Sequence, residues 1–217
     1  MKKLESSLKN MMLSLFFICA VMSAALSLVY MSTKGPIEAT EQKKINDAIG
    51  LVVPAFDNNP SSDMYKVGII DSVGGTIISD TLNFYPAFSG GKIVGTAVKT
   101  YTNKGFGGFI SIMIGFSPDG KIINTKVMEQ KETPGLGTKM NDVKFHDQFN
   151  GKSSSDFKFS VKKDGGDVDA ITAATISSRA FCDAVNRAYK AFNNSASVNS
   201  VSDTLTTKNK SENGGEE

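Results

Sequence analysis

An uncharged, apolar run near the N-terminus limits what this chain can fold into more than any other feature, because it is long enough to cross a lipid bilayer. The run, Met11–Met31, reads MMLSLFFICAVMSAALSLVYM. A helix of about 21 residues matches the thickness of a hydrocarbon core. Lys2, Lys3 and Lys9 precede the run, whereas Lys34 is the only positive charge close behind it. This asymmetry predicts that the N-terminus is cytoplasmic and that the bulk of the chain lies outside the cytoplasm.

A cleavable signal peptide is the main alternative for this segment. The basic start fits one, and Ser23-Ala24-Ala25 is small enough for a signal peptidase. The apolar part of a signal peptide is normally about 7–15 residues long, however, and here it continues to Met31. We therefore expect a retained anchor. The expected division is a cytoplasmic N-terminus (1–10), a transmembrane helix (11–31), an extracytoplasmic domain (32–192) and a flexible polar tail (193–217).

The chain beyond the apolar run is long enough for one domain with a hydrophobic core, since about 150 of the 217 residues remain for it. The formal net charge is +2, from 24 basic and 22 acidic residues, so we expect no nucleic acid to bind. Cys19 lies in the apolar run and Cys182 in the domain, so no intrachain disulfide is expected. His146 is the single histidine and has no partner at metal-ligand spacing, so no metal centre is expected.

Hydrophobic spacing predicts an α+β domain. After a hinge at Gly35-Pro36, the stretch from Thr40 to Val52 has apolar residues at helical spacing. Pro118 and Gly120 then separate two apolar runs, which predicts a hairpin. Short connections between the strands favour a mainly antiparallel sheet with flanking helices. The expected strands are 65–71, 76–79, 82–88, 92–101, 108–116 and 121–129.

The stretch 169–178, DAITAATISS, stands directly before an amphipathic helix and carries the candidate chemistry. Thr175 falls in the first turn of that helix, where free backbone N–H groups and the helix dipole favour a phosphate. The alternative is that the threonines only cap the helix, because Ser and Thr are common at helix starts. The spacing by itself leaves both interpretations open.

Two blocks of residues resemble a known family. Asp169-x-x-Thr172-Ala173-Ala174-Thr175 is similar to the motif at which a flavin transferase links FMN, through its phosphate, to the final Thr. The segment 132–137, ETPGLG, resembles a block placed close to the flavin in the same proteins. Together with the N-terminal span, these blocks resemble the G subunit of the Rnf ion-translocating ferredoxin:NAD oxidoreductase. Ala173 replaces the commoner Gly, and Gln130-Lys131 stands where a His is frequent.

The resemblance implies an electron-transfer subunit that carries FMN covalently on Thr175, with Asp169 recognised by the transferase. It also implies other integral membrane subunits as partners, membrane lipid around the anchor, and a soluble domain on the periplasmic side of the inner membrane. The residues implied to contact the cofactor, besides Thr175, are Thr172, Ala173, Ala174, Ser178, Glu132, Thr133, Gly135, Leu136 and Gly137.

Three alternatives remain open at this point. The C subunit of the sodium-pumping NADH:quinone reductase shares both blocks, although this chain looks short for it. A membrane-tethered binding domain without cofactor would use the Thr-rich helix start only as a cap. A free-standing extracytoplasmic reductase would use the same FMN domain without membrane partners.

Overall fold

The computed structural model of the chain describes residues 8–73 and 76–211, and its first element is a long helix, α1 (Leu8–Val52). The expected hinge is wrong, because α1 continues through Gly35 and contains Pro36. The Thr33 hydroxyl donates to the Val29 carbonyl at 2.8 Å, and the Thr40 hydroxyl donates to the Pro36 carbonyl at 2.7 Å. Neither bond reaches the Ser32 carbonyl, which Pro36 cannot serve because proline has no N–H, so α1 continues past this position with one helical hydrogen bond fewer.

The N-terminal part of α1 is long and apolar enough to cross a membrane. Its most apolar window has a mean hydropathy of 2.4, and none of that window is buried. Two compact units make up the chain, one ending at Lys44 and the other beginning at Ile45. The expected membrane boundary between residues 31 and 32 concerns the bilayer and stays a prediction. Residues 1–7 of the expected cytoplasmic N-terminus lie outside the described residues.

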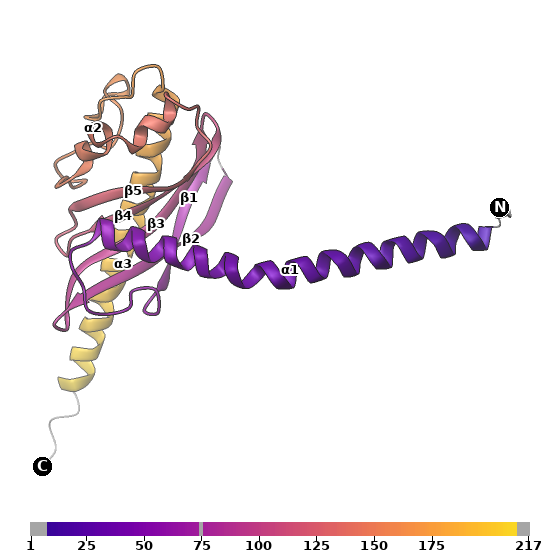
Figure 1. Ribbon diagram of the computed structural model, residues 1–217. Helices are drawn as coiled ribbons and strands as arrows, with labels where there is room; N and C mark the ends of the chain where they lie inside the picture. The colour runs from indigo at the N-terminus through magenta and orange to yellow at the C-terminus, as the bar shows by residue number, and fades with distance from the viewer. Residues whose placement is uncertain (1–7, 74–75, 212–217) are drawn as a thin grey trace, which may run out of the picture. The chain divides into compact units, whose positions relative to one another are not determined.

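The second unit contains a five-stranded sheet in the order β1-β2-β3-β4-β5, with every neighbouring pair antiparallel (Figure 1). This confirms the expected α+β class. Segments 76–79 and 82–88 belong to one strand, because Asp80 and Thr81 continue the pairing with β1. The polar pair resembles a strand break in the sequence, but Arg187, from the helix α3 (Thr175–Ser211), binds the Asp80 carboxylate at 2.5 Å. The strands are β1 (Tyr65–Val73), β2 (Thr76–Ser89), β3 (Lys92–Gly105), β4 (Gly108–Phe116) and β5 (Ile122–Gln130).

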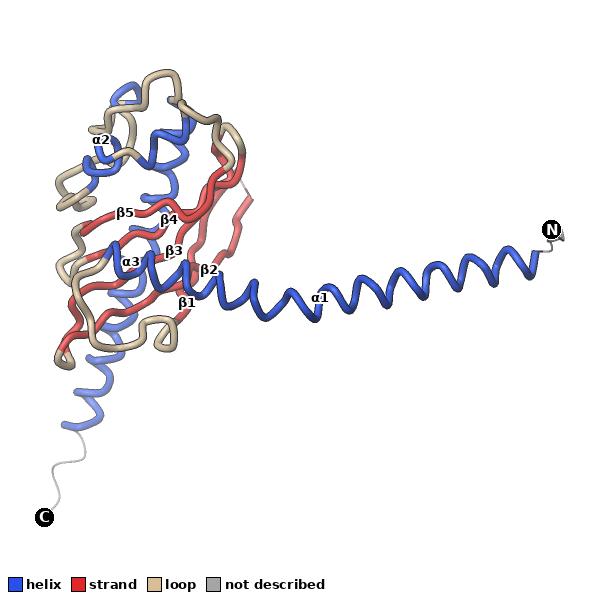
Figure 2. Tube along the Cα trace, in the orientation of Figure 1, coloured by secondary structure: helices blue, strands red, loops and turns tan. Residues whose placement is uncertain are grey.

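Both faces of the sheet are covered, and the strands follow the two-residue period of a sheet. In β4, Ile112 and Ile114 belong to the core shared with helix α3 (Thr175–Ser211). Met113, between them, belongs to a second core with Ile49 at the end of α1. The red sheet in Figure 2 accordingly lies between α3 and the last turns of α1. The central strands are therefore apolar on both sides, while the edges are less enclosed.

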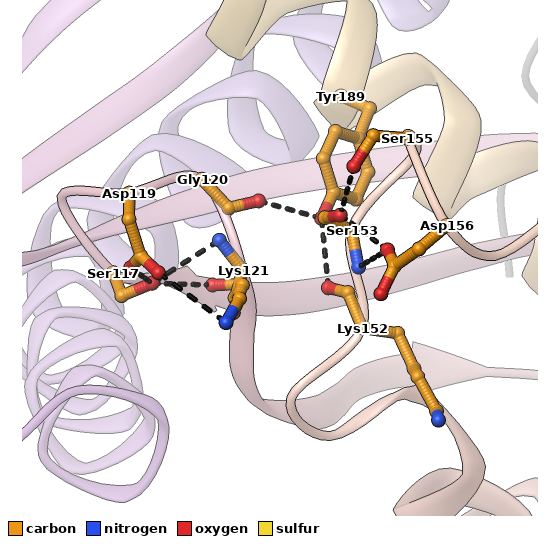
Figure 3. Close-up of polar contacts among 9 residues, drawn as sticks. All are labelled: Ser117, Asp119, Gly120, Lys121, Lys152, Ser153, Ser155, Asp156 and Tyr189. Atoms are coloured by element: carbon orange, nitrogen blue, oxygen red, sulfur yellow. Dashed lines mark hydrogen bonds and ion pairs between the residues drawn. The ribbon is translucent and has the colours of Figure 1, made fainter.

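The predicted β4–β5 hairpin is confirmed and is bound to α3 by a tyrosine. The Ser117 N–H donates to the Lys121 carbonyl at 2.9 Å, and Gly120 has the positive φ of 80° that its turn position requires. The hydroxyl of Tyr189, on α3, lies 2.7 Å from the Gly120 carbonyl oxygen and 2.9 Å from that of Lys152 (Figure 3). One buried side chain thus joins the hairpin, the loop after it and the helix.

Short helical turns fill the long connection between β5 and α3. They are η1 (Gly137–Asn141), α2 (Val143–His146), η2 (Asp147–Phe149) and η3 (Lys162–Asp164). Helix α3 then runs to Ser211, so residues 193–211 of the expected flexible tail are helical. The sequence has no Gly or Pro between Thr175 and Ser211, so no strong helix breaker ends α3 at Asn193. Residues 212–217 of the expected tail lie outside the described residues.

Candidate functional site

A cavity of about 350 Å³ lies where the first turn of α3 meets the loop after β5 and the turn between β3 and β4. It brings together the two sequence blocks, which are far apart along the chain. Its lining residues are Phe106, Glu132, Thr133, Leu136, Gly137, Ala173, Ala174, Thr175, Ile176 and Ser177. The cavity is therefore the candidate flavin site.

The structure sorts the expected cofactor-binding residues into two groups. The first group lines the cavity and consists of Glu132, Thr133, Leu136, Gly137, Ala173, Ala174 and Thr175. The expected cofactor-binding residues that do not line it are Gly135, Thr172 and Ser178. Asp169, expected to be recognised by the transferase and not to bind the cofactor, also lies outside the lining. Sequence reasoning missed Phe106, Ile176 and Ser177, of which the last two simply follow Thr175. A phenylalanine placed between glycines at 105 and 107 was the available signal for Phe106.

The start of α3 is uncapped, and this bears on the capping alternative. The residue before the helix is Ala174, whose carbonyl accepts the Ser178 N–H at 3.0 Å but which has no hydroxyl to act as a cap. Among the described residues, none supplies an acceptor to the N–H groups of Thr175, Ile176 and Ser177. Thr175 is the first residue of α3, one position after the N-cap, so its hydroxyl is not in the position that caps the helix. Unpaired N–H groups facing a cavity at the positive end of a helix are suited to an anion.

Ser178 holds the segment that enters the helix. Its buried hydroxyl accepts the Ile171 N–H at 2.9 Å and donates to the Ala174 carbonyl at 3.0 Å. These bonds close the turn at residues 172–173, between Ile171 and the start of α3. Ser178 thus fixes the direction in which Thr175 is presented, rather than lining the cavity.

Ala173 has a strained backbone, with a φ of 61° in the left-handed region. An L-residue with a side chain pays about 1–2 kcal/mol there, whereas glycine does not. We therefore expect Ala173→Gly to raise the free energy of unfolding by about 1 kcal/mol, measured by denaturant unfolding. The control is Ala174→Gly, next to it and 7% exposed, which is expected to lower stability because it removes a buried methyl group. A loss of stability in Ala173→Gly would show that the methyl group makes a contact that outweighs the strain.

Glu132 and Ser177 form a buried polar pair at the cavity. Glu132 Oε2 accepts the Ser177 hydroxyl at 2.6 Å, and Oε1 accepts the Gly107 N–H at 3.0 Å. A Cβ atom at Gly137 would lie 2.6 Å from both Glu132 Oε2 and Ser177 Oγ, so only glycine fits there. The carboxylate therefore joins the β3–β4 turn, the loop after β5 and the first turn of α3.

Three apolar side chains at this cavity are exposed to solvent. Phe106 is 68% exposed, Ile176 48% and Leu136 39%. Large exposed apolar side chains around one cavity indicate a binding surface more than a scattered set would. They can offer flat apolar contact to a planar ring.

Asp169 lies outside the cavity with its carboxylate presented to solvent. Its side chain is 69% exposed and pairs with Lys162 at 2.8 Å. Its backbone is fixed independently, because Gln148 accepts the Asp169 N–H at 2.7 Å and donates to its carbonyl at 3.2 Å. The Asp169 carboxylate is thus accessible to another protein, while the side chain of Gln148 holds the backbone at Asp169 in place.

A second cavity of about 350 Å³ lies on the other side of Ile176. Its charged side chains pair with one another, Arg179 with Asp164 at 2.7 Å and Lys104 with Asp183 at 2.6 Å. Burial raises the pKa of the Cys182 thiol to about 12, so this side chain is not a nucleophile at neutral pH. We assign no ligand to this cavity.

Comparison with known proteins agrees with the first cavity. Residues 105–190 match the family model of the FMN-binding domain, a range that includes every residue lining that cavity. The fold and the site thus define an FMN-binding electron-transfer protein. Among the described residues, no group of three or more His, Cys, Asp or Glu side chains is arranged to hold a metal ion.

Relatives identify the family. The chain is 33% identical over 189 residues to the G subunit of the Na(+)-translocating ferredoxin:NAD(+) oxidoreductase complex of Acetobacterium woodii, covering 84% of this chain and 90% of the relative. It is 36% identical over 183 residues to the G subunit of the ion-translocating oxidoreductase complex of Erwinia tasmaniensis, covering 80% and 84%. The crystal structure of Shewanella oneidensis NqrC is 19% identical, covers 70% of this chain and 91% of that one, and has a TM-score of 0.49. The chain belongs to the family of G subunits of ion-translocating oxidoreductase complexes, which confirms the family expected from the sequence.

Proposed function

We propose that this protein relays electrons through FMN carried as a phosphodiester on the Thr175 hydroxyl. One observation supports this most directly: Thr175 lines a cavity at an uncapped helix start, where three N–H groups have no acceptor among the described residues. A phosphodiester keeps one negative charge, which the N–H groups and the helix dipole stabilise. Thr175 is then an anchor for the cofactor and not a catalytic residue.

The rest of the cavity fits the ring of FMN. Leu136, Ile176 and Phe106 supply apolar surface, while Gly137 leaves room where any side chain would collide with Glu132 and Ser177. Bound FMN would supply the transfer of one or two electrons. The protein's own part is to hold the phosphate, to orient the ring and to keep the cofactor from diffusing away.

The remaining features support a place in a membrane complex. The apolar part of α1 favours a membrane anchor, surrounded by lipid, and the lysines before it favour an extracytoplasmic domain on the periplasmic side of the inner membrane. Covalent attachment would keep FMN on a domain outside the cytoplasm, where FMN lost by diffusion would not be replaced. The partners would be the other integral membrane subunits and, during maturation, a flavin transferase.

Intact-mass measurement tests the linkage. Protein produced together with a flavin transferase is expected to carry one FMN less one water, and its denatured gel band is expected to fluoresce. A bare chain from the same preparation would contradict the proposal and would favour a tethered binding domain without cofactor. Co-purification with integral membrane subunits separates a complex subunit from a free-standing reductase.

Asp169 provides a second test, directed at maturation. We expect Asp169→Asn to lower the rate of flavin attachment about tenfold or more, because a charged hydrogen-bond partner of the transferase is lost. The fold should persist, since Gln148 bonds the backbone of Asp169 and not its carboxylate. Attachment is followed by gel fluorescence over time. Lys162→Gln is the control: it removes the ion-pair partner but leaves the carboxylate, so attachment at the rate of the unaltered chain is expected. Equal rates in Asp169→Asn and the unaltered chain would exclude a recognition role.

A further inference from the structure

A buried carboxylate faces the same cavity as Thr175. Glu132 is 5% exposed and Ser177, which donates to it, is 2% exposed. Each carboxylate oxygen accepts a hydrogen bond, Oε1 from the Gly107 N–H and Oε2 from the Ser177 hydroxyl. Acceptance at both oxygens is the pattern of an ionised carboxylate. The cavity wall therefore holds a fixed negative charge.

No cation neutralises this charge within the part of the chain that the structure describes. There, none of the ion pairs within 4.0 Å includes Glu132. Backbone encloses the carboxylate instead: a Cβ atom at Gly105 would lie 2.5 Å from Oε1, and one at Gly137 would lie 2.6 Å from Oε2. A charge that water screens poorly acts over a longer range than one on the surface.

We propose that the Glu132 carboxylate lowers the reduction potential of the FMN attached to Thr175. This inference rests on the proposed function. One electron arrives from a one-electron carrier in a neighbouring subunit, and the same electron leaves to an oxidised carrier, so no bond forms or breaks in the protein. The ring gains a negative charge when the electron arrives, and a fixed negative charge in the cavity wall opposes that gain. Glu132 needs no bond to the cofactor for this effect.

A purely structural role is the alternative, because Glu132 also joins three segments through Gly107 and Ser177. Glu132→Gln separates the two roles. Glutamine keeps the shape, its oxygen can accept the Gly107 N–H, and its NH2 group can donate to the Ser177 hydroxyl oxygen. The links are kept and the charge is lost. A structural role predicts no change of potential, and an electrostatic role predicts a rise.

The experiment is a redox titration of the full chain with its flavin attached, monitored by flavin absorbance. Intact mass is measured first, so that absence of flavin from the unaltered chain counts against the proposed function and not against this inference. We expect Glu132→Gln to favour the reduced form about tenfold, which is a rise of about 59 mV for one electron. A loaded variant with an unchanged or lower potential would overturn the inference.

Two further variants keep the test decisive. Glu129→Gln removes the same charge from an exposed side chain on β5, where water screens it, and is expected to leave the potential nearly unchanged. Glu132→Asp keeps the carboxylate in the cavity wall, so a potential close to that of the unaltered chain is expected. If Glu132→Gln does not fold or load, Glu132→Met replaces it as the uncharged variant, and an unchanged or lower potential there contradicts the inference.

Discussion

Thr175→Val is expected to abolish covalent flavin completely while leaving the domain folded. Valine has the shape of threonine but lacks the oxygen that would carry the phosphate. The structure records no hydrogen bond from the Thr175 side chain to another described residue, so stability should change by less than about 0.5 kcal/mol. Intact mass and fluorescence of the denatured protein measure the flavin, and thermal unfolding measures stability.

Thr133→Val is the matched control for this prediction, since Thr133 lines the same cavity and also carries a hydroxyl. It is expected to keep a covalent flavin, because its hydroxyl does not lie at the start of α3. Flavin retained in Thr175→Val, or lost in Thr133→Val alone, would move the attachment to another side chain. Flavin lost equally from both would indicate that the cavity, and not one hydroxyl, is needed for attachment.

The elements that the sequence predicts well are those determined by local chemistry. The β4–β5 hairpin follows from Pro118 and Gly120, which preset the turn. One error arises where a contact distant in sequence contributes. The pair Asp80-Thr81 continues a strand because Arg187, far along the chain, binds the Asp80 carboxylate. The expected hinge at Gly35-Pro36 was an error of another kind, because a single proline removes one hydrogen bond and does not by itself end a helix as long as α1.

The candidate site likewise has features that the sequence predicts and features that only the fold shows. The motif around Thr175 and the block from Glu132 to Gly137 could be found in the sequence, but only the fold shows that they share one cavity. The sequence could not show that Ser178 bonds backward into the turn. Nor could it show that a turn between two strands brings Phe106 to the cavity. A capping role for Thr175 was open from the sequence and is disfavoured once Ala174 is seen to occupy the capping position.

Gly115→Ala is expected to cause a large loss of stability in the domain. Gly115 lies on β4, in contact with the last turn of α1. A Cβ atom at Gly115 would lie 1.8 Å from the carbonyl oxygen of Val52 and 2.5 Å from its carbonyl carbon. Backbone cannot rotate away as a side chain can. The last turn of α1 must therefore move, although the Asn124 side chain bonds the Leu51 carbonyl at 3.0 Å and Ile49 is fully buried.

We expect this substitution to lower the free energy of unfolding by about 3 kcal/mol, the upper part of the usual range for overpacking. Gly68→Ala on β1 is the control, because a Cβ atom there meets nothing within 4 Å, and its effect should stay within about 0.5 kcal/mol. Denaturant unfolding of the full chain in detergent measures both. The cavity lies against α3 and not against this end of α1, so folded Gly115→Ala protein should still carry flavin. Equal stability of the two variants would mean that α1 packs on the sheet more loosely than the contact at Val52 indicates.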